Sequence, residues 1–336
     1  MERIVRDHMS FSPDAVIASL RARMPASASG ELCVAFSGGL DSTVLLAVLA
    51  RAVRGTSDLR VRAIHIGHQL QPQSGQWARH CGDIARELGV HFESHRVAVV
   101  LDPEEGLEAS ARLARYEALT ALMRPSETLV MAHHSDDQLE TMLLALMRGS
   151  GVRGLASMPD CQPLGPGLLV RPLLDLSREA LEQWATQEGL RWVEDPTNDD
   201  HRFSRNLLRA RILPVLRDRW PAAARNAARS AAHLAESAVL ADELAALDHA
   251  AVAIDACLDV ARLETLSAAR RRNLLRFWIR QQGGRLPSTR KLLALEHDML
   301  AAAPDRVPVV EWDGFAVRRF RGLLYADRSG EPQLCA

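Results

Sequence analysis

The sequence contains almost no lysine: Lys291 is the only one, and the other basic residues apart from histidine are arginines. A Walker-type phosphate-binding loop ends in Gly-Lys followed by Ser or Thr, and its lysine reaches the terminal phosphates of the nucleotide. That class of loop is therefore excluded. The dinucleotide pattern Gly-x-Gly-x-x-Gly is present at Gly149, Gly151 and Gly154, but it follows a predicted helix instead of a strand, so a Rossmann site is not indicated.

Cysteine is also scarce. The five cysteines are odd in number and scattered, and no Cys-x-x-Cys pair occurs among them. This pattern argues against a disulfide framework, a zinc ribbon and a cysteine-held iron–sulfur cluster. We expect reduced cysteines that serve mainly in packing: Cys33, Cys81, Cys161, Cys257 and Cys335.

Long apolar runs are missing as well. No stretch approaches the roughly 20 residues of a membrane span, and Met1 to Pro13 carries Arg3, Arg6 and Asp7 without an apolar signal core. The sequence therefore predicts a soluble, cytoplasmic protein with no membrane partner. Its 336 residues suffice for two or three domains.

The two parts of the chain differ in charge. Residues 1–200 hold 19 arginines against 27 acids, and residues 201–336 hold 22 basic residues against 15 acids. A basic half suggests a polyanion as partner, nucleic acid above all. A compositional preference for arginine explains the missing lysine, but it does not explain this segregation.

The first half alternates between strand and helix patterns, which predicts an α/β fold with a doubly wound parallel sheet. From about residue 177 the pattern is mainly helical, and residues 307–325 read as short strands around the turn Asp313-Gly314. We therefore expect a catalytic domain over residues 1–215 and a mainly helical domain ending in short strands over residues 216–336. The expected strands are Leu32–Phe36, Val61–Ile66, His91–Val100 and Thr128–Ala132; the helices between them are Asp41–Val53, Gln76–Leu88, Leu107–Arg124 and Ser135–Met147.

The segment Ser37-Gly38-Gly39-Leu40-Asp41-Ser42 stands between the first strand and the first helix of this pattern. Two adjacent glycines let backbone N–H groups converge on one point, and the helix N-terminus adds its positive dipole end, so the segment predicts a phosphate site. Ser37 and Ser42 would donate hydroxyls, and Asp41 would hold Mg²⁺ or cap the helix. An ordinary Gly-Gly turn with an Asp cap is the plainer alternative.

A second polar segment, His133-His134-Ser135-Asp136-Asp137-Gln138-Leu139-Glu140, follows a later strand. Ser135 with Gln138 has the spacing of a capping box, so a helix is expected to start here. Asp137 and Glu140 share one face of that helix. These acids suit the helix dipole in any protein, but with two histidines beside them they also predict a metal site or an anionic pocket for an amine.

Ser37–Ser42 resembles the PP-loop of the N-type ATP pyrophosphatases, which cleave ATP between the α- and β-phosphates. The second segment, continuing to Leu155, resembles the signature of the tRNA(Ile)-lysidine synthase family. Other stretches agree with that family in the same order over about residues 30–215: Glu108–Tyr116, Arg171–Leu174, Trp192–Asn198 and Phe203–Arg209.

This resemblance implies a reaction and a set of roles. ATP adenylates the C2 oxygen of the wobble cytidine in an isoleucine tRNA with a CAU anticodon, and free L-lysine then displaces AMP. ATP would be bound by Ser37–Ser42 and His133, with Asp41 holding Mg²⁺, and lysine by Asp137 and Glu140. Catalytic roles fall to Asp41, Arg112, Asp137 and Arg205, and tRNA contacts to Arg205, Arg209, Arg271 and Arg319.

Several alternatives stay open from the residues themselves. Without the family resemblance, solvated helix surface is the preferred interpretation of Arg112, Arg115 and Arg205, and His65 and His68 receive no role. A PP-loop tRNA thiolase, a non-catalytic tRNA-binding protein and a ligase acting on a small metabolite are competing functions, and a homodimer is compatible with the sequence. Some family members carry a further C-terminal domain, which a chain ending at Ala336 is expected to lack.

Overall fold

The computed structural model describes residues 11–67, 74–102, 106–194, 200, 202–303 and 306–328. The chain forms two compact units, Met1–Ala235 and Glu236–Ala336. The division falls inside helix α10 (Ala223–Val252), whereas the sequence places a boundary at residue 215. The first turns of α10 belong to the first unit because Ala227 packs with Leu139 and Leu213. The predictions for His68 and for residues 195–199 lie outside the described residues.

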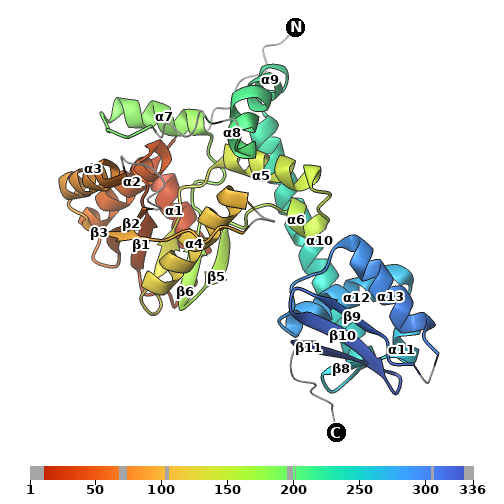
Figure 1. Ribbon diagram of the computed structural model, residues 1–336. Helices are drawn as coiled ribbons and strands as arrows, with labels where there is room; N and C mark the ends of the chain where they lie inside the picture. Colours follow the sequence, from red (N-terminus) through yellow and green to blue (C-terminus); the bar gives the residue numbers. More distant parts are fainter. Residues whose placement is uncertain are drawn as a thin grey trace. The chain divides into compact units, whose positions relative to one another are not determined.

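The first unit is built on a six-stranded sheet with the order β3-β2-β1-β4-β6-β5 (Figure 1). All described pairings are parallel except that of β5 with β6, which is a hairpin. The predicted parallel α/β sheet is confirmed, and two strands that were not predicted extend it: β6, which is parallel to β4, and the antiparallel edge strand β5. The strands are β1 (Glu31–Ala35), β2 (Arg60–Gly67), β3 (His91–Arg96), β4 (Thr128–Val130), β5 (Cys161–Leu164) and β6 (Gly167–Val170).

Helices cover both faces of this sheet. Successive side chains of β1 point to opposite faces, and since they are apolar on both, each face must be covered. Leu32 and Val34 point into a core shared with α1, α2, α3 and α7, and Cys33 points to the opposite core, where Leu119 of α4 packs. The helices of the unit up to residue 187 are α1 (Pro13–Arg23), α2 (Leu40–Gly55), α3 (Ser74–Leu88), α4 (Gly106–Leu122), α5 (Ser135–Met147), α6 (Val152–Leu155) and α7 (Arg178–Gln187).

The strand order reverses next to β1. The chain runs from β1 outward through β2 and β3, and then returns to β4 on the other side of β1. Ligands of open α/β sheets bind beyond the carboxyl ends of the strands at such a switch point. The segments that leave β1 and β4 are the two polar segments singled out in the sequence, so the topology brings them to one place.

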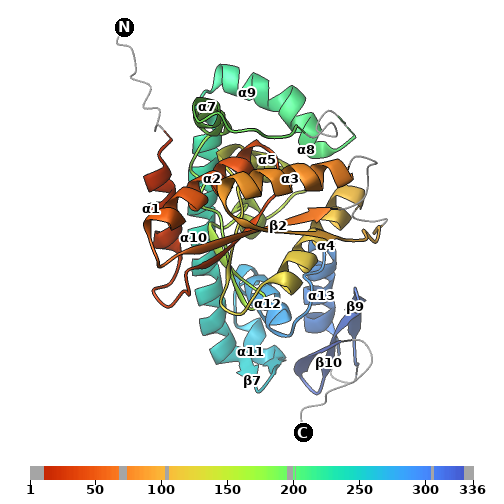
Figure 2. The ribbon, with the colours of Figure 1, turned by 90° about the vertical axis from the view of Figure 1, so that its left-hand side faces the viewer.

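Residues 204–219 form a bent helical segment instead of one regular helix. It consists of α8 (Ser204–Leu207), the π-helical turn η2 (Leu208–Ile212) and α9 (Leu213–Arg219). Pro214 lies in the first turn of α9, a position that tolerates proline. In both ribbon views α8 and α9 lie beside the start of α5 (Figures 1 and 2).

The second unit combines helices with a five-stranded antiparallel sheet in the order β7-β8-β11-β10-β9. The predicted strands around Asp313 and Gly314 are confirmed, and both residues have positive φ (45° and 73°), as a tight hairpin turn requires. The elements are β7 (Ala253–Ile254), β8 (Cys257–Asp259), α11 (Val260–Glu264), α12 (Ala268–Gln281), α13 (Thr289–Ala301), β9 (Val309–Trp312), β10 (Phe315–Phe320) and β11 (Leu323–Arg328).

Within the residues that the structure describes, none of the helices combines the length and apolar character needed to cross a membrane.

Candidate active site

The loop Ser37–Ser42 folds into a compact turn held by its own hydroxyls. Ser37 Oγ lies 3.0 Å from Ser42 Oγ and accepts from the backbone N–H of Gly39 at 3.3 Å. Ser42 Oγ also donates to the carbonyl of Gly39 at 3.1 Å. Gly39 is the N-cap of α2 and has no side chain to satisfy the first N–H groups of the helix. Those groups are thus left for an anion, as the sequence predicts.

Gly38 is required by both its conformation and its surroundings. Its φ is +79°, and a Cβ at this position would lie only 2.7 Å from Cys81 Sγ. Cys81 is fully buried, and burial raises the pKa of its thiol to about 12. The loop therefore lies against a buried, protonated side chain from α3, which leaves no room for a larger residue at position 38.

Asp41 offers one carboxylate oxygen to a ligand. Its Oδ1 is buried and has no hydrogen-bond partner among the described residues, while its Oδ2 lies 3.6 Å from His134 Nε2. Leu40 beside it is a core residue, so only its backbone can face a phosphate. Across the described part of the chain no group of three or more His, Cys, Asp or Glu could hold a metal ion. A single carboxylate oxygen fits Mg²⁺, which proteins commonly bind through one or two carboxylates together with nucleotide phosphates.

Helix α5 begins one residue earlier than a Ser135 cap implies. His134 is the N-cap, and its backbone N–H donates to Asp137 Oδ2 at 3.0 Å. The predicted capping box of Ser135 and Gln138 is therefore wrong. The Gln138 amide is used elsewhere: it donates to the carbonyl of Met158 at 2.8 Å and accepts from the Met158 N–H at 2.9 Å.

His134 joins the two polar segments. Its Nε2 lies 3.4 Å from Asp137 Oδ2 and 3.6 Å from Asp41 Oδ2, and its Nδ1 lies 3.7 Å from Asp136 Oδ2. Burial on its own lowers the pKa of His134, but these carboxylates, led by Asp137, raise it to about 9. Burial likewise raises the pKa of Asp137, yet the neighbouring cations hold it well below its usual range. A charged imidazolium among carboxylates follows.

This charge predicts a pH-dependent contribution to stability. A histidine whose pKa rises from 6.5 to about 9 on folding stabilises the fold fully below pH 6.5 and loses that effect as the pH passes 9. We expect the free energy of unfolding to fall over this interval, with each unit of pKa difference worth about 1.4 kcal/mol. Denaturant titrations at several pH values should show this fall in the wild type.

The His134→Gln variant should lose this component, whereas His91→Gln, at a side chain 67% exposed, should keep it. Equal pH slopes in His134→Gln and the wild type would contradict the assignment.

His133 is a neutral hydrogen-bonding group. Burial lowers its pKa to about 3, and the nearby cations Arg171, Arg112 and Arg205 act in the same direction. Arg171 Nε donates to His133 Nδ1 at 3.2 Å, so the imidazole proton is on Nε2. Tyr116 Oη accepts from Arg171 and from Arg112 at 3.3 Å each. The structure thus brings His133 and Arg112, both predicted site residues, into one network.

The predicted amine-binding carboxylates are paired with Arg209 of η2. Its Nη2 donates to Asp137 Oδ1 at 2.8 Å, and its Nε donates to Glu140 Oε1 at 2.5 Å. Burial raises the pKa of Glu140, and Arg209 counteracts this effect. Glu140 Oε2 is buried without a hydrogen-bond partner among the described residues. The two carboxylates are therefore occupied by a cationic side chain of the same chain, and their binding of an amine stays a prediction.

Arg205 and Arg217 contact the same helix on either side of Arg209. Arg205 Nη2 donates to Thr141 Oγ1 at 3.1 Å, and its Nη1 lies 3.9 Å from Glu140 Oε2. Arg217 Nη2 donates to Asp136 Oδ1 at 2.7 Å. Together these arginines form a basic wall along the acidic start of α5.

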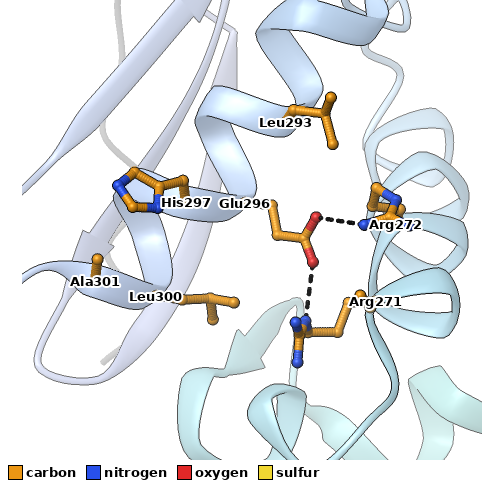
Figure 3. Close-up of a pocket in the computed structure, with 8 residues that line it drawn as sticks. Arg271, Arg272, Leu293, Glu296, His297, Leu300 and Ala301 are labelled. Carbon is orange, nitrogen blue, oxygen red and sulfur yellow. Dashed lines mark hydrogen bonds and ion pairs between the residues drawn. The ribbon is translucent and has the colours of Figure 1, made fainter.

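The two predicted tRNA contacts in the second unit have internal partners. Arg271 donates to Glu296 Oε1 at 2.9 Å and to the carbonyl of Leu266 at 3.0 Å, and Arg272 also reaches Glu296 (Figure 3). They border a hollow of about 520 Å³ between α12 and α13. Arg319 donates to three carbonyls at the end of α13, which offsets the negative end of that helix dipole. Their roles toward tRNA stay predictions.

Sequence reasoning missed several members of the site. Arg171 and Arg217 received no role, and His134 and Asp136 were considered only as members of the segment His133–Glu140, although each of the four touches a predicted residue. The sequence spacing could have indicated Arg217: Arg205, Arg209 and Arg217 are separated by multiples of four residues, which places them on one face of a helix. No such signal marked Arg171, which arrives from β6.

Comparison with known proteins bears on the family of this chain. A family model described as a PP-loop domain matches residues 14–216, and one described as the TilS substrate binding domain matches residues 258–325. The tRNA(Ile)-lysidine synthase of Coxiella burnetii is 42% identical over 299 residues, covering 89% of this chain and 66% of that protein. The enzyme of the same name from Alkalilimnicola ehrlichii is 45% identical over 322 residues, covering 96% and 72%.

The chain thus spans about two thirds of the length of these relatives. A solved U34-tRNA thiolase from Methanococcus maripaludis shares the fold, with a TM-score of 0.53 at 16% identity, covering 66% of this chain and 78% of that one. The lysidine synthase interpretation is favoured over the thiolase and the non-catalytic alternative, because these curated relatives carry that name and both family models fit. The chain belongs to the tRNA(Ile)-lysidine synthase family.

Proposed function

We propose that this protein makes lysidine in an isoleucine tRNA with a CAU anticodon, using ATP and free L-lysine in the cytoplasm. The observation that carries this proposal is the meeting of two segments. His134 lies 3.6 Å from Asp41 of the glycine loop and 3.4 Å from Asp137 of the acidic helix start. The residues proposed for the nucleotide and those proposed for the amine therefore lie side by side, which supports a reaction between a nucleotide and an amine.

In the first step the C2 oxygen of the wobble cytidine attacks the α-phosphorus of ATP, and pyrophosphate leaves. The N–H groups at the start of α2 hold the departing phosphates, with the Ser37 and Ser42 hydroxyls beside them. Asp41 would hold Mg²⁺ against these phosphates, and the ion would offset their charge. Arg112 and the neutral His133 are suited to contact the nucleotide or the base, because they share one hydrogen-bonded network.

In the second step the ε-amine of lysine, as the free base, attacks C2 and forms the C–N bond. AMP leaves with the former C2 oxygen, and the proton released from the attacking nitrogen passes to water. Asp137 and Glu140 are placed to bind the ammonium groups of free lysine, since each already accepts from the guanidinium of Arg209. A bound lysine would take over part of that pairing. Arg205, 3.9 Å from Glu140 Oε2, is suited to steady the adenylated base beside it.

The state of the cysteines supports a ligase over a thiolase. Cys33 and Cys81 are buried, and burial raises the pKa of both thiols to about 12. Thiolates, not thiols, are the nucleophiles of cysteine chemistry. These two side chains are therefore suited to packing.

The proposal is tested by incubating the protein with ATP, Mg²⁺, labelled lysine and total tRNA, followed by digestion to nucleosides. We expect a labelled nucleoside from one tRNA species, and the Asp137→Asn variant should need roughly tenfold more lysine, as for a lost charged hydrogen bond. Absence of label from every tRNA, with protein that binds ATP, would refute the proposal. Transfer of sulfur instead of lysine would favour the thiolase.

A further inference from the structure

The helical segment of residues 204–219 has two faces with different surroundings. Arg205, Arg209, Leu213 and Arg217 face α5: the arginines bind its side chains, and Leu213 is 1% exposed and packs against Leu139. Residues two positions along a helix are rotated by about 200°. The set displaced by two, Arg211, Val215 and Arg219, is exposed, with Val215 at 67%. The same segment thus bonds to α5 with one face and offers the other to solvent.

The exposed face ends in an aromatic side chain. Trp220 is 55% exposed, whereas Trp184, Trp278 and Trp312 are buried. Arg219 lies over its ring, with Cζ 5.6 Å from the ring centroid. An exposed tryptophan next to arginine is the pairing on which unstacked RNA bases are commonly held.

The charge around this tryptophan is of one sign. Residues 202–229 contain eight arginines and a single acid, Asp218. Arg211 and Arg225 are exposed, and their side chains have no hydrogen-bond or ion-pair partner within the described residues. By contrast, Arg205 and Arg209, which the family resemblance assigns to tRNA, are engaged by the acids of α5. Arg211 thus offers a free cation on the outer face of the segment, and Arg225 offers another in the first turn of α10.

We propose that Arg211, Arg219, Trp220 and Arg225 form an RNA-binding surface, with the arginines on phosphates and Trp220 stacked on an unpaired base. This proposal rests on the proposed function, because that function supplies an RNA loop whose base must enter the site behind the segment. RNA loops expose both phosphates and splayed bases, which is the chemistry this face presents. Arg217 binds Asp136 on the inner face, and Arg219 is only two residues further along the same helix. An RNA loop bound to Arg219 is therefore separated from the acidic start of α5 by about the width of one helix.

Binding of an isoleucine tRNA transcript, measured by filter retention between about 50 and 200 mM salt, tests the surface. Arg211→Ala/Arg219→Ala should weaken binding roughly tenfold and reduce the slope of log Kd against log salt by about 1.4, as for two single-strand phosphate contacts. Trp220→Ala should weaken binding about fivefold or more, and Trp220→Phe should restore most of it, as expected for stacking. Arg60→Ala is the control: it is 78% exposed and lies at the opposite, amino-terminal end of β2.

Wild-type affinity and salt slope in the double arginine variant would overturn the proposal, as would a loss of binding in Trp220→Phe equal to that in Trp220→Ala. A matching loss in Arg60→Ala would also overturn it, because the effect would then be one of general charge. Lysine incorporation by the wild type is measured in parallel. Failure of that reaction refutes the proposed function, while RNA affinity alone decides on the surface.

Discussion

Replacing Asp41 with asparagine should reduce tRNA-dependent ATP–pyrophosphate exchange by at least about 100-fold. The carboxylate has a buried oxygen, Oδ1, without a hydrogen-bond partner in the described chain, and its second oxygen faces the His134 imidazolium at 3.6 Å. An amide keeps the shape but removes the negative charge that would hold Mg²⁺ at the phosphates. Exchange of labelled pyrophosphate into ATP, at saturating tRNA, measures the effect.

Retention of tRNA on a filter should survive in the same Asp41→Asn protein, because Asp41 belongs to the nucleotide end of the site. Asp58→Asn is a matched control, since its side chain is 61% exposed and precedes β2; its exchange rate should stay close to the wild type. Parallel loss of tRNA binding and exchange in Asp41→Asn would contradict this division of roles.

Replacing Gly38 with alanine should have the second large effect. A left-handed backbone costs a non-glycine residue about 1–2 kcal/mol, and the new Cβ would lie 2.7 Å from the fully buried Cys81 Sγ. The loop must shift, and a displacement of about 1 Å at a phosphate site lowers rates about 100-fold. We expect weaker ATP binding, slower exchange and a lower melting temperature.

Removing the Cys81 thiol should restore part of the activity that Gly38→Ala loses. The double variant Gly38→Ala/Cys81→Ala keeps the backbone strain but lacks Sγ, so its exchange rate should lie between those of Gly38→Ala and the wild type. Gly55→Ala is the matched control: it lies at the last position of α2, and a Cβ added there would meet no heavy atom within 4 Å. Its stability should be unchanged or slightly higher. Equal activity in Gly38→Ala and Gly55→Ala would show that the close contact with Cys81 is unimportant.

Much of the catalytic unit was accessible from the sequence because its signals are local. The strand before Ser37, the glycine turn and the apolar helix after it are consecutive, and α5 was predicted with its observed bounds of Ser135–Met147. Alternation of strands and helices was sufficient for the parallel strands β1 to β4, whereas β5 and β6 were not predicted. The strands β7 and β8 escaped prediction because they are only two and three residues long. β7 pairs with β8, and β8 is held in turn by β11, far along the chain.

The helix start at α5 shows how a local pattern fails. Ser135 and Gln138 have the spacing of a capping box, yet the Gln138 amide gains two hydrogen bonds from the backbone of Met158, 20 residues away. Asp137 then caps the helix through the N–H of His134. Buried backbone N–H and C=O groups need hydrogen-bond partners. Those of Met158 find theirs in the Gln138 side chain, which is therefore not available to cap the helix.

The arginines show the same limit on a larger scale. Their composition indicated a polyanion, but not which side chains are available to bind it. Arg271 and Arg319 are occupied with helix ends and with Glu296, and Arg209 with acids 69 and 72 residues away. Partners at such separations depend on strand order and helix packing, which no sequence window contains.

By itself, the sequence determined that this is a PP-loop protein of the lysidine synthase family, because the glycine loop and the acidic helix start are contiguous runs whose chemistry is local. Only the tertiary structure decided that the two runs meet at His134, and that His134 is charged there. It also decided which face of residues 204–219 is turned inward. The physical reason is that charge state and accessibility are set by neighbours in space, and these neighbours come from β1, β4 and the segment before α10.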